Sequence, residues 1–191
     1  MIRVLVIDDH PAMRGGLETV LSATPDIVPV GAGSDERDLW HLLRRTAPDL
    51  VLLDYHLPGQ DGLMLCHRIK NLTLHPAVII YSAYADESLL IAATVAGADG
   101  VLHKNAPAEE LFAAIRAVAA AEPMLPAASP GAVRAAAQKL PDDERPMLGM
   151  LLQRTSLIDV ADTLRIPLDE AAERVRSIIG RLHVRVPAGA E

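Results

Sequence analysis

Short runs of branched apolar residues alternate with longer amphipathic stretches over the first 121 residues of the chain. The runs lie at Val4–Ile7, Ile27–Val30, Leu50–Leu53, Val78–Tyr81 and Val101–Leu102. The stretches between them carry apolar residues at helical spacing, as at Leu111, Ile115 and Val118. Each run predicts a strand, and each stretch predicts a helix.

Strands that alternate with helices predict a parallel sheet, because parallel strands need long crossover connections that a helix can supply. The runs are apolar at consecutive positions, which is typical of strands covered on both faces. The pattern therefore predicts an α/β domain over residues 1–121, with a doubly wound, five-stranded parallel sheet.

Prolines and small residues break this rhythm at residues 122–139. Pro123, Pro126 and Pro130 predict a linker, because proline does not continue a helix or a sheet ladder. A short alanine-rich helix is expected at the end of the linker, at about Ala132–Lys139.

The last part of the chain has only helical patterns. Three helices are expected over residues 140–185, the second starting near Ser156 and the third spanning about Leu168–His183. The tight turn at Arg165–Pro167 favours a helix-turn-helix unit. We therefore expect a small all-α C-terminal domain, followed by a tail at residues 186–191.

Composition narrows the class of protein. Half of the 191 residues are apolar, which excludes general disorder. The longest uncharged apolar stretch, Leu89–Ala98, is shorter than the roughly 20 residues that a membrane-spanning helix needs. Val4–Ile7 ends directly in an aspartate, unlike a signal peptide, and the single cysteine, Cys66, excludes a disulfide framework. We expect a soluble cytoplasmic protein with no membrane partner.

The net charge of −7 is unevenly distributed. Residues 1–122 carry 9 basic and 16 acidic side chains, whereas residues 123–191 carry 9 of each. An acidic body with a neutral tail domain is not the usual charge pattern of a nucleic-acid-binding protein.

Polar side chains gather where the predicted strands end. The first strand ends at Asp8 and Asp9, the third at Asp54 and the fourth at Ser82, and the fifth runs into Lys104. Open α/β sheets bind ligands at this edge, and Mg²⁺ relieves the repulsion between converging carboxylates. A lysine and a hydroxyl suit phosphate oxygens. The set therefore indicates a magnesium-dependent site for phosphoryl transfer onto a carboxylate.

Each of these residues also has a plainer interpretation when taken alone. The aspartates could cap the next helix, Ser82 could be a turn residue, and Lys104 could be a solvated surface lysine. Five such residues at the ends of four predicted strands are hard to explain by capping. The functional interpretation is therefore favoured.

Residues 1–121 resemble the receiver domain of bacterial two-component response regulators. The matching segments are VLVIDDHPAMRGGL, PDLVLLDYHLPGQDGL, VIIYSAY and GADGVLHKNAPAEEL. The resemblance implies a flavodoxin-like sheet with strand order 2-1-3-4-5. It also implies a signalling protein rather than an enzyme, phosphorylated on Asp54 by a sensor histidine kinase.

The resemblance implies a role for each acidic residue. Asp54 would be the phosphoacceptor. Asp9 and Asp54 would bind Mg²⁺ directly, together with the backbone carbonyl of His56, and Asp8 would act mainly through water. The implied cofactor is therefore Mg²⁺.

The remaining receiver residues would handle the phosphoryl group. By resemblance, Lys104 contacts the phosphoryl oxygens, and Ser82 turns to hydrogen-bond them after transfer. His56 and Tyr84 lie two residues beyond Asp54 and Ser82, where the family tunes dephosphorylation by shielding the phosphoryl group from water. Because both side chains are bulky, we expect a long-lived phosphoryl state.

One position departs from the family pattern. The family has Tyr or Phe three residues before the lysine, and this chain has Val101. Either Tyr81 or Tyr84 could take the role of that ring, or the switch is weaker than in relatives.

Residues 140–185 resemble, more weakly, the helix-turn-helix output domain of the NarL/FixJ (LuxR-type) subfamily. The resemblance places the third helix, about Leu168–His183, in the major groove of DNA as the recognition helix. The candidate DNA contacts are Arg174, Arg176, Arg181 and Arg185. The subfamily often dimerises on activation, which implies a homodimer, although this chain ends in VPAGAE where relatives have a dimerising helix.

The start of that helix departs from the subfamily, which has polar and basic residues where this chain has Asp169, Glu170 and Glu173. Two functions therefore stay open. The first is a phosphorylation-controlled transcription regulator that binds DNA. The alternative is a response regulator whose output domain acts through protein–protein interaction without DNA.

An enzyme of the haloacid-dehalogenase phosphatase type is a third, disfavoured function. Such phosphatases use Asp-x-Asp after the first strand, whereas here Asp8 and Asp9 are adjacent. The acceptor-like residue, Asp54, instead follows the third strand.

Overall fold

The computed structural model of the chain describes residues 1–122 and 124–182. Outside these residues lie His183, the expected last residue of the third C-terminal helix, and Arg185, a candidate DNA contact. The chain forms two compact units. The first contains residues 1–85 and 97–125, and the second contains residues 86–96 together with the chain from residue 126 onward. Each unit is described by itself below.

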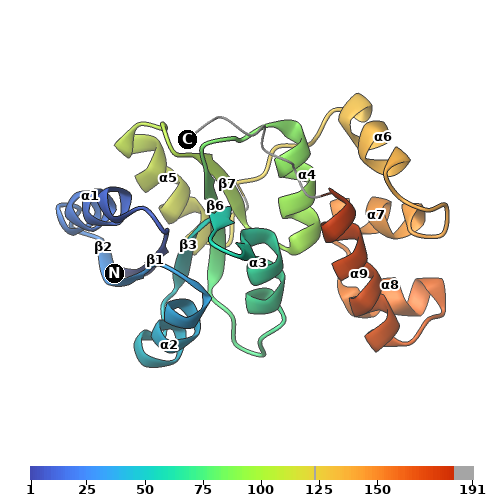
Figure 1. Cartoon of the computed structure of the whole chain (residues 1–191), viewed down its shortest axis with the longest axis horizontal. Helices are drawn as coiled ribbons and strands as arrows, with labels where there is room; N and C mark the ends of the chain where they lie inside the picture. Colours follow the sequence, from blue (N-terminus) through green and yellow to red (C-terminus); the bar gives the residue numbers. More distant parts are fainter. Residues whose placement is uncertain (123, 183–191) are drawn as a thin grey trace. The chain divides into compact units, whose positions relative to one another are not determined.

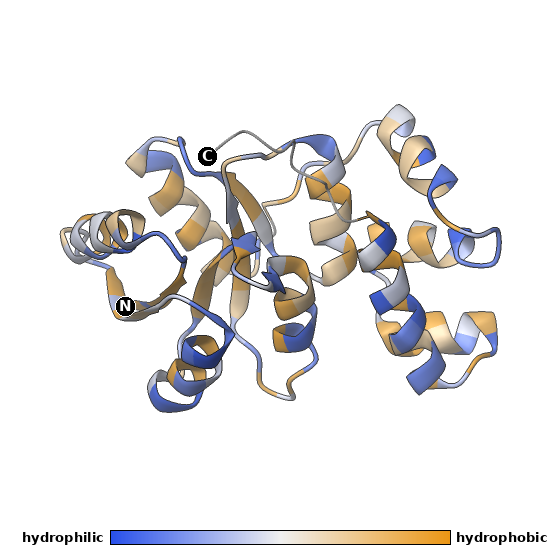
Figure 2. Ribbon diagram, viewed as in Figure 1, coloured by the Kyte–Doolittle hydropathy of each residue, from blue (hydrophilic) through white to orange (hydrophobic). Residues whose placement is uncertain are grey.

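The first unit is built on a five-stranded parallel sheet in the order β2-β1-β3-β6-β7. In chain order the strands are β1 (Ile2–Ile7), β2 (Ile27–Gly33), β3 (Leu50–Asp54), β6 (Ala77–Ser82) and β7 (Gly100–His103). Each of them contains one of the predicted apolar runs, and their order is the expected 2-1-3-4-5, so both predictions are confirmed. Figure 2 shows how apolar the strands are in comparison with the helices around them.

Helices cover both faces of this sheet, as the doubly wound pattern predicts (Figure 1). Helices α1 (Pro11–Ser22) and α5 (Ala108–Ala119) contribute Leu17, Leu21, Leu111 and Ile115 to one buried cluster with alternate strand residues. Helices α2 (Glu36–Thr46) and α3 (Gly62–Lys70) pack on the other side of the strands. Burial on both faces explains why the strands are apolar at consecutive positions.

A tight hairpin that the apolar pattern did not predict follows the third strand. Its strands are β4 (His56–Leu57) and β5 (Gln60–Asp61), joined through Gly59, whose φ of 69° favours glycine. The hairpin returns the chain to Gly62, where an added Cβ would lie 2.4 Å from the backbone oxygen of Asp54. Only glycine fits at such a distance, so α3 starts directly against the end of β3.

The second unit is helical. It contains α4 (Glu87–Ala96), α6 (Pro130–Gln138), α7 (Arg145–Leu152), α8 (Leu157–Leu164) and α9 (Leu168–Leu182). Helix α8 is capped by Ser156, whose Oγ accepts a hydrogen bond from the amide of Asp159, and it is followed by Arg165, the C-cap residue, with a φ of 55°. The predicted helix near Ser156 and the tight turn before the last helix are therefore present, and with them the small all-α region.

Helix α4 belongs to this helical unit, although it lies between β6 and β7 in the chain. It packs with α6, α7 and α9, and the carboxylate of Glu87 accepts hydrogen bonds from the amide and the hydroxyl of Ser129, the residue that caps α6. Apolar residues all round α4 are buried, among them Leu89, Ile91 and Val95. The first domain is expected at residues 1–121 and therefore includes α4, whereas the compact units group α4 with the C-terminal helices. The expected domain boundaries stay a prediction.

Among the described residues, no helix is both long enough and apolar enough to span a bilayer.

Candidate functional site

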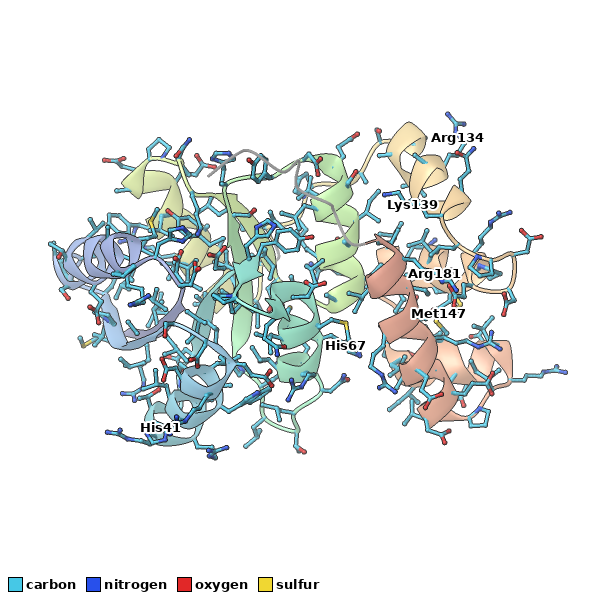
Figure 3. The ribbon with its side chains drawn as sticks, viewed as in Figure 1. His41, His67, Arg134, Lys139, Met147 and Arg181 are labelled. Atoms are coloured by element: carbon cyan, nitrogen blue, oxygen red, sulfur yellow. The ribbon has the colours of Figure 1, made fainter. Side chains whose placement is uncertain are left out.

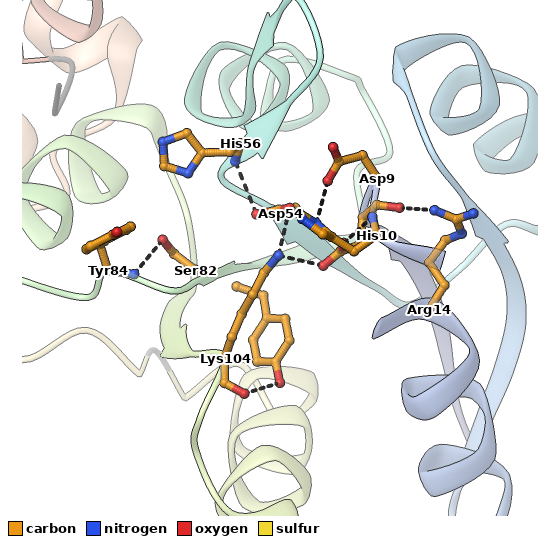
Figure 4. Close-up of polar contacts among 10 residues, drawn as sticks. Asp9, His10, Arg14, Asp54, His56, Ser82, Tyr84 and Lys104 are labelled. Carbon is orange, nitrogen blue, oxygen red and sulfur yellow. Dashed lines mark hydrogen bonds and ion pairs between the residues drawn. The ribbon is translucent and has the colours of Figure 1, made fainter. Parts of the chain in front are cut away.

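The side chains predicted to meet at the strand ends do meet in the first unit (Figure 4). The Nζ atom of Lys104 lies 2.7 Å from Oδ2 of Asp54 and 2.7 Å from Oδ2 of Asp8. Both carboxylates are almost fully buried, with 2 % of each side chain exposed. One ammonium therefore neutralises two buried acids that come from β3 and from the end of β1.

The local electrostatics follow from this geometry. Burial raises the pKa of Asp54, and the hydrogen bond and charge of Lys104 act against that rise. Burial acts to lower the pKa of Lys104, but the adjacent carboxylates of Asp54 and Asp8 outweigh it, so the pKa of Lys104 is raised. Lys104 is therefore a permanent cation at neutral pH.

Backbone groups fix the second oxygen of each of the two buried carboxylates. Oδ1 of Asp54 accepts a hydrogen bond from the amide of His56 at 3.1 Å, and Oδ1 of Asp8 accepts one from the amide of His10 at 2.8 Å. The guanidinium of Arg14 donates to the backbone oxygen of Asp8 at 2.6 Å. The loops after β1 and β3 thus hold both carboxylates toward the same point.

The site fits a hard divalent cation. Ligand atoms of Asp8, Asp9, His10 and Asp54 lie within 4.8 Å of one another. Oδ2 of Asp8 and Oδ1 of Asp9 are buried and accept no hydrogen bond among the described residues, although they lie at ion-pair distance from Lys104 and His10. Buried carboxylate oxygens without hydrogen bonds are the donors that Mg²⁺ prefers.

Three further predicted residues, Ser82, His56 and Tyr84, lie around the cluster of carboxylates and lysine (Figure 4). Ser82 is fully buried, and its Oγ accepts a hydrogen bond from the amide of Tyr84 at 3.1 Å. Within the described part of the chain, no hydrogen bond joins the Ser82 hydroxyl to Asp54. The side chain of Tyr84 is half-buried and that of His56 is exposed, both beside the site.

A contact that the strand-end pattern did not predict holds the main chain of Lys104. The hydroxyl of Tyr81, the residue before Ser82, donates a hydrogen bond to the backbone oxygen of Lys104 at 3.1 Å. Val101 lies half-buried in β7 and has no polar group in its side chain. Both Tyr81 and Tyr84 are candidates by sequence for the role of the family's ring, and only the folded chain distinguishes their hydroxyls.

The candidate DNA contacts in the second unit are engaged by acids. Arg174 pairs with Glu170 at 2.7 Å and with Asp143 at 3.7 Å, and Arg176 lies 3.8 Å from Glu173. The side chain of Arg181 lies 3.5 Å from the carboxylate of Glu144, which also accepts a hydrogen bond from Ser177. Arg185 lies outside the described residues. The three candidate arginines that the structure describes therefore have acidic partners within their own unit. Figure 3 labels Arg181 among them.

The start of α9 is acidic and partly apolar at the surface. The side chain of Glu173 is 75 % exposed and that of Glu170 42 % exposed, and half of Leu168 is exposed. Asp169 accepts a hydrogen bond from the amide of its neighbour Glu170, which is not the bond of a helix cap. The acids are thus presented to solvent rather than used to cap the helix.

Comparison with known proteins gives one family match. A family model described as the response regulator receiver domain matches residues 4–116. The nitrate/nitrite response regulator NarL of Escherichia coli strain K12 is 35 % identical over 122 residues, which cover 64 % of this chain and 56 % of NarL. The chain therefore matches little more than half the length of that relative. The transcriptional regulatory protein LiaR of Bacillus subtilis strain 168 is 29 % identical over 194 residues, covering 96 % of this chain and 92 % of LiaR.

Solved structures agree with these relatives. A LuxR-family two-component response regulator from Aurantimonas sp. SI85-9A1 matches with a TM-score of 0.61 at 28 % identity, covering 69 % of this chain and 92 % of that one. The response regulator ChrA of a heme-sensing two-component system matches with a TM-score of 0.56 at 31 % identity, covering 94 % and 89 %. The similarity to ChrA thus extends over both units.

Proposed function

The chain belongs to the response regulator receiver family, as a member of the NarL/LuxR type, and from this premise we propose that it is the phosphorylated component of a two-component phosphorelay. A sensor histidine kinase phosphorylates it on Asp54, and the C-terminal helices then regulate transcription by binding DNA. The observation that carries the proposal is the pair of buried carboxylates, Asp8 and Asp54, held by one ammonium at the end of the sheet.

The transfer step follows from that arrangement. A carboxylate oxygen of Asp54 forms a bond to phosphorus while the bond from phosphorus to the donor histidine nitrogen breaks, and the imidazole leaves with the electron pair of that bond. Negative charge on the phosphoryl oxygens is stabilised by the ammonium of Lys104, which already lies beside the nucleophile.

Magnesium would be held by Asp9 and Asp54, with the backbone carbonyl of His56 as a further ligand and Asp8 acting mainly through water. The ion would supply positive charge that brings the phosphodonor against Asp54. The buried oxygens of Asp8 and Asp9 that accept no hydrogen bond among the described residues support this assignment.

The signal then passes through Ser82. The Ser82 hydroxyl donates to a phosphoryl oxygen, and its Oγ, which accepts from the amide of Tyr84, couples that new bond to the loop before α4. Helix α4 packs with α6, α7 and α9, so a shift in its start biases the arrangement of the helical unit. Phosphorylation thus acts as a population shift between two packings.

The proposal is tested by intact-mass analysis of the full chain incubated with Mg²⁺ and acetyl phosphate. We expect the wild type to gain the mass of one phosphoryl group, and the Asp54→Asn variant to gain none. Asp61→Asn is the matched control, because Asp61 caps α3 and an asparagine can keep that cap. A wild type that stays unmodified, or an Asp54→Asn variant modified to the same extent, contradicts the proposal.

A second function for the output unit is favoured by a specific observation. Arg174, Arg176 and Arg181 are paired with acids of their own unit, and the exposed start of α9 is acidic. Both features oppose binding to a polyanion. They support the alternative in which phosphorylation controls a protein–protein interaction and DNA is not bound.

A titration of duplex DNA across salt concentrations separates the two functions. Binding through phosphate contacts weakens with salt by a logarithmic slope of about −0.9 for each contact. A steep slope for the phosphorylated chain supports transcription regulation through DNA. The absence of measurable binding at low salt supports the protein-interaction function.

A further inference from the structure

The main chain of Lys104 is held by two consecutive residues of β6. The backbone oxygen of Ser82 accepts a hydrogen bond from the Lys104 amide at 2.8 Å. The hydroxyl of Tyr81 donates a hydrogen bond to the Lys104 backbone oxygen at 3.1 Å, as Figure 4 shows. Strand β6 thus fixes the amide through one residue and the carbonyl through the other.

Fixing this carbonyl matters because Lys104 lies just beyond the sheet. Strand β7 ends at His103, so Lys104 is the first residue of the following turn. Its ammonium sits at the end of a flexible four-carbon chain. The ammonium can be aimed at Asp54 reliably only if the main chain that carries it does not rotate.

Tyr81 is itself firmly placed. Its side chain is 5 % exposed and packs in the cluster formed by alternate strand residues with α1 and α5. In the sheet it is the register partner of Asp54, and its backbone oxygen accepts a hydrogen bond from the amide of Tyr55 at 3.3 Å. One residue therefore contacts both the strand that carries the phosphoacceptor and the turn that carries the lysine.

We propose that Tyr81 is a positioning residue for phosphoryl transfer at Asp54, because its hydroxyl holds the Lys104 carbonyl and so keeps the Lys104 ammonium aimed at the phosphoryl oxygens. The inference rests on the proposed function and extends it to a residue that does not contact the phosphoryl group. Burial raises the pKa of Tyr81, so its hydroxyl remains a donor at neutral pH. Val101, on the neighbouring strand, offers no such donor.

The first test compares Tyr81→Phe with wild type in the full chain, which removes the hydroxyl and keeps the ring. With Mg²⁺ and acetyl phosphate, we expect the phosphorylation rate of Asp54 to fall about tenfold, since small misplacements of a reacting group cost up to a hundredfold. Thr24→Val is the control. It removes another buried hydroxyl that donates to a backbone carbonyl, at the end of α1, and should leave the rate unchanged.

A positioning role is separated from a structural one by repeating Tyr81→Phe in a Lys104→Ala background. If Tyr81 acts through the ammonium of Lys104, adding Tyr81→Phe to the Lys104→Ala variant causes no further loss of phosphorylation rate, because the ammonium is already absent. An equal loss in both backgrounds overturns the proposal.

A spectroscopic measurement on the lysine itself gives an independent readout. The ¹³C shift of its Cε at one neutral pH reports whether the ammonium still lies beside Asp54 and Asp8, so it should change in Tyr81→Phe and stay unchanged in Thr24→Val. An unchanged Cε shift together with an unchanged rate overturns the proposal.

The outcomes distinguish this inference from the proposed function. If the wild type is never phosphorylated on Asp54, the proposed function fails first. If the wild type is phosphorylated and Tyr81→Phe is phosphorylated as fast, only the role of Tyr81 is overturned. Should Tyr81→Phe fail to fold by circular dichroism, Tyr81→Met, which fills the same apolar space without a hydroxyl, is measured in its place with the same criteria.

Discussion

The ammonium of Lys104 lies 2.7 Å from Oδ2 of Asp54, although the two residues are 50 positions apart in the chain. The same ammonium lies 2.7 Å from Oδ2 of Asp8. A single lysine thus compensates two carboxylates that the sheet buries at its edge. Stability and phosphoryl chemistry therefore depend on the same side chain.

Replacing Lys104 by methionine should affect both properties. Removing one partner of a buried charge pair costs about 3–5 kcal/mol, so we expect a fall of that size in the free energy of unfolding without Mg²⁺ at neutral pH. Phosphorylation of Asp54 should slow about a hundredfold, the usual loss for one stabilising donor. Urea denaturation and intact-mass kinetics measure the two effects. Lys139→Met, at the exposed position that follows the last residue of α6, is the control (Figure 3), and equal stability of the two variants contradicts this prediction.

Shortening either side chain beside the phosphoacceptor should shorten the life of the phosphoryl group. His56 and Tyr84 border the site. We expect their bulk to limit the access of water to a phosphoryl group on Asp54. We expect His56→Ala and Tyr84→Ala each to accelerate phosphate release several-fold, measured after removal of the phosphodonor. His41→Ala, at an exposed position on α2, serves for comparison. Release at the wild-type rate in both variants would show that shielding is not their role.

Acid should weaken the first unit through a surface pair. Both carboxylate oxygens of Asp26 accept hydrogen bonds from Arg116, at 2.7 and 2.8 Å, and the pKa of Asp26 is lowered to about 2 by the hydrogen bond to Arg116. Because the folded pKa lies below the unfolded one, the pair stabilises the fold above about pH 4, and this contribution is lost as pH falls toward about 2.

Urea midpoints measured between these pH values test that prediction. Between these pH values the wild type should lose more of its free energy of unfolding than the Asp26→Asn variant, because the variant has no titrating group at position 26. Since both side chains are half-exposed, high salt should reduce the difference. Parallel curves for the two proteins at low salt would be inconsistent with the pair.

Neutralising the start of α9 should strengthen binding to DNA. The triple substitution Asp169→Asn, Glu170→Gln and Glu173→Gln removes three negative charges and releases Arg174 from Glu170 and Arg176 from Glu173. Each arginine that then contacts a phosphate should steepen the salt slope by about 0.9. Fluorescence anisotropy with a labelled duplex measures the change.

A control with the same change in charge uses Glu109→Gln, Glu110→Gln and Glu122→Gln in the first unit. It should alter DNA binding less than the α9 variant. If the α9 variant binds no more tightly than the control, the acids at the start of α9 do not limit contact with DNA.

Much of the fold and site could be predicted because the signals are local. A strand buried on both faces must be apolar at consecutive positions, so β1, β3 and β6 are visible in the amino-acid sequence alone. The sequence also shows which polar residue follows each strand. In a parallel sheet those residues share one edge, and this is why Asp8, Asp54 and Lys104 could be expected to meet.

The hairpin after β3 shows where such signals end. Its strands are two residues each, too short for any alternation of apolar and polar positions. Gly59 and Gly62 are visible in the sequence, but the close approach of Gly62 to the backbone of Asp54 exists only once α3 has packed.

By itself, then, the chain's order of residues determined the alternation of strands and helices and the set of polar groups at the sheet edge. Only the tertiary structure decided which groups bond: that Tyr81 rather than Tyr84 holds Lys104, that α4 packs with the C-terminal helices, and that Arg174 pairs with Glu170. Periodicity is a property of neighbours along the chain. A hydrogen bond needs two atoms within about 3 Å, and for residues far apart only the packing of whole elements sets that distance.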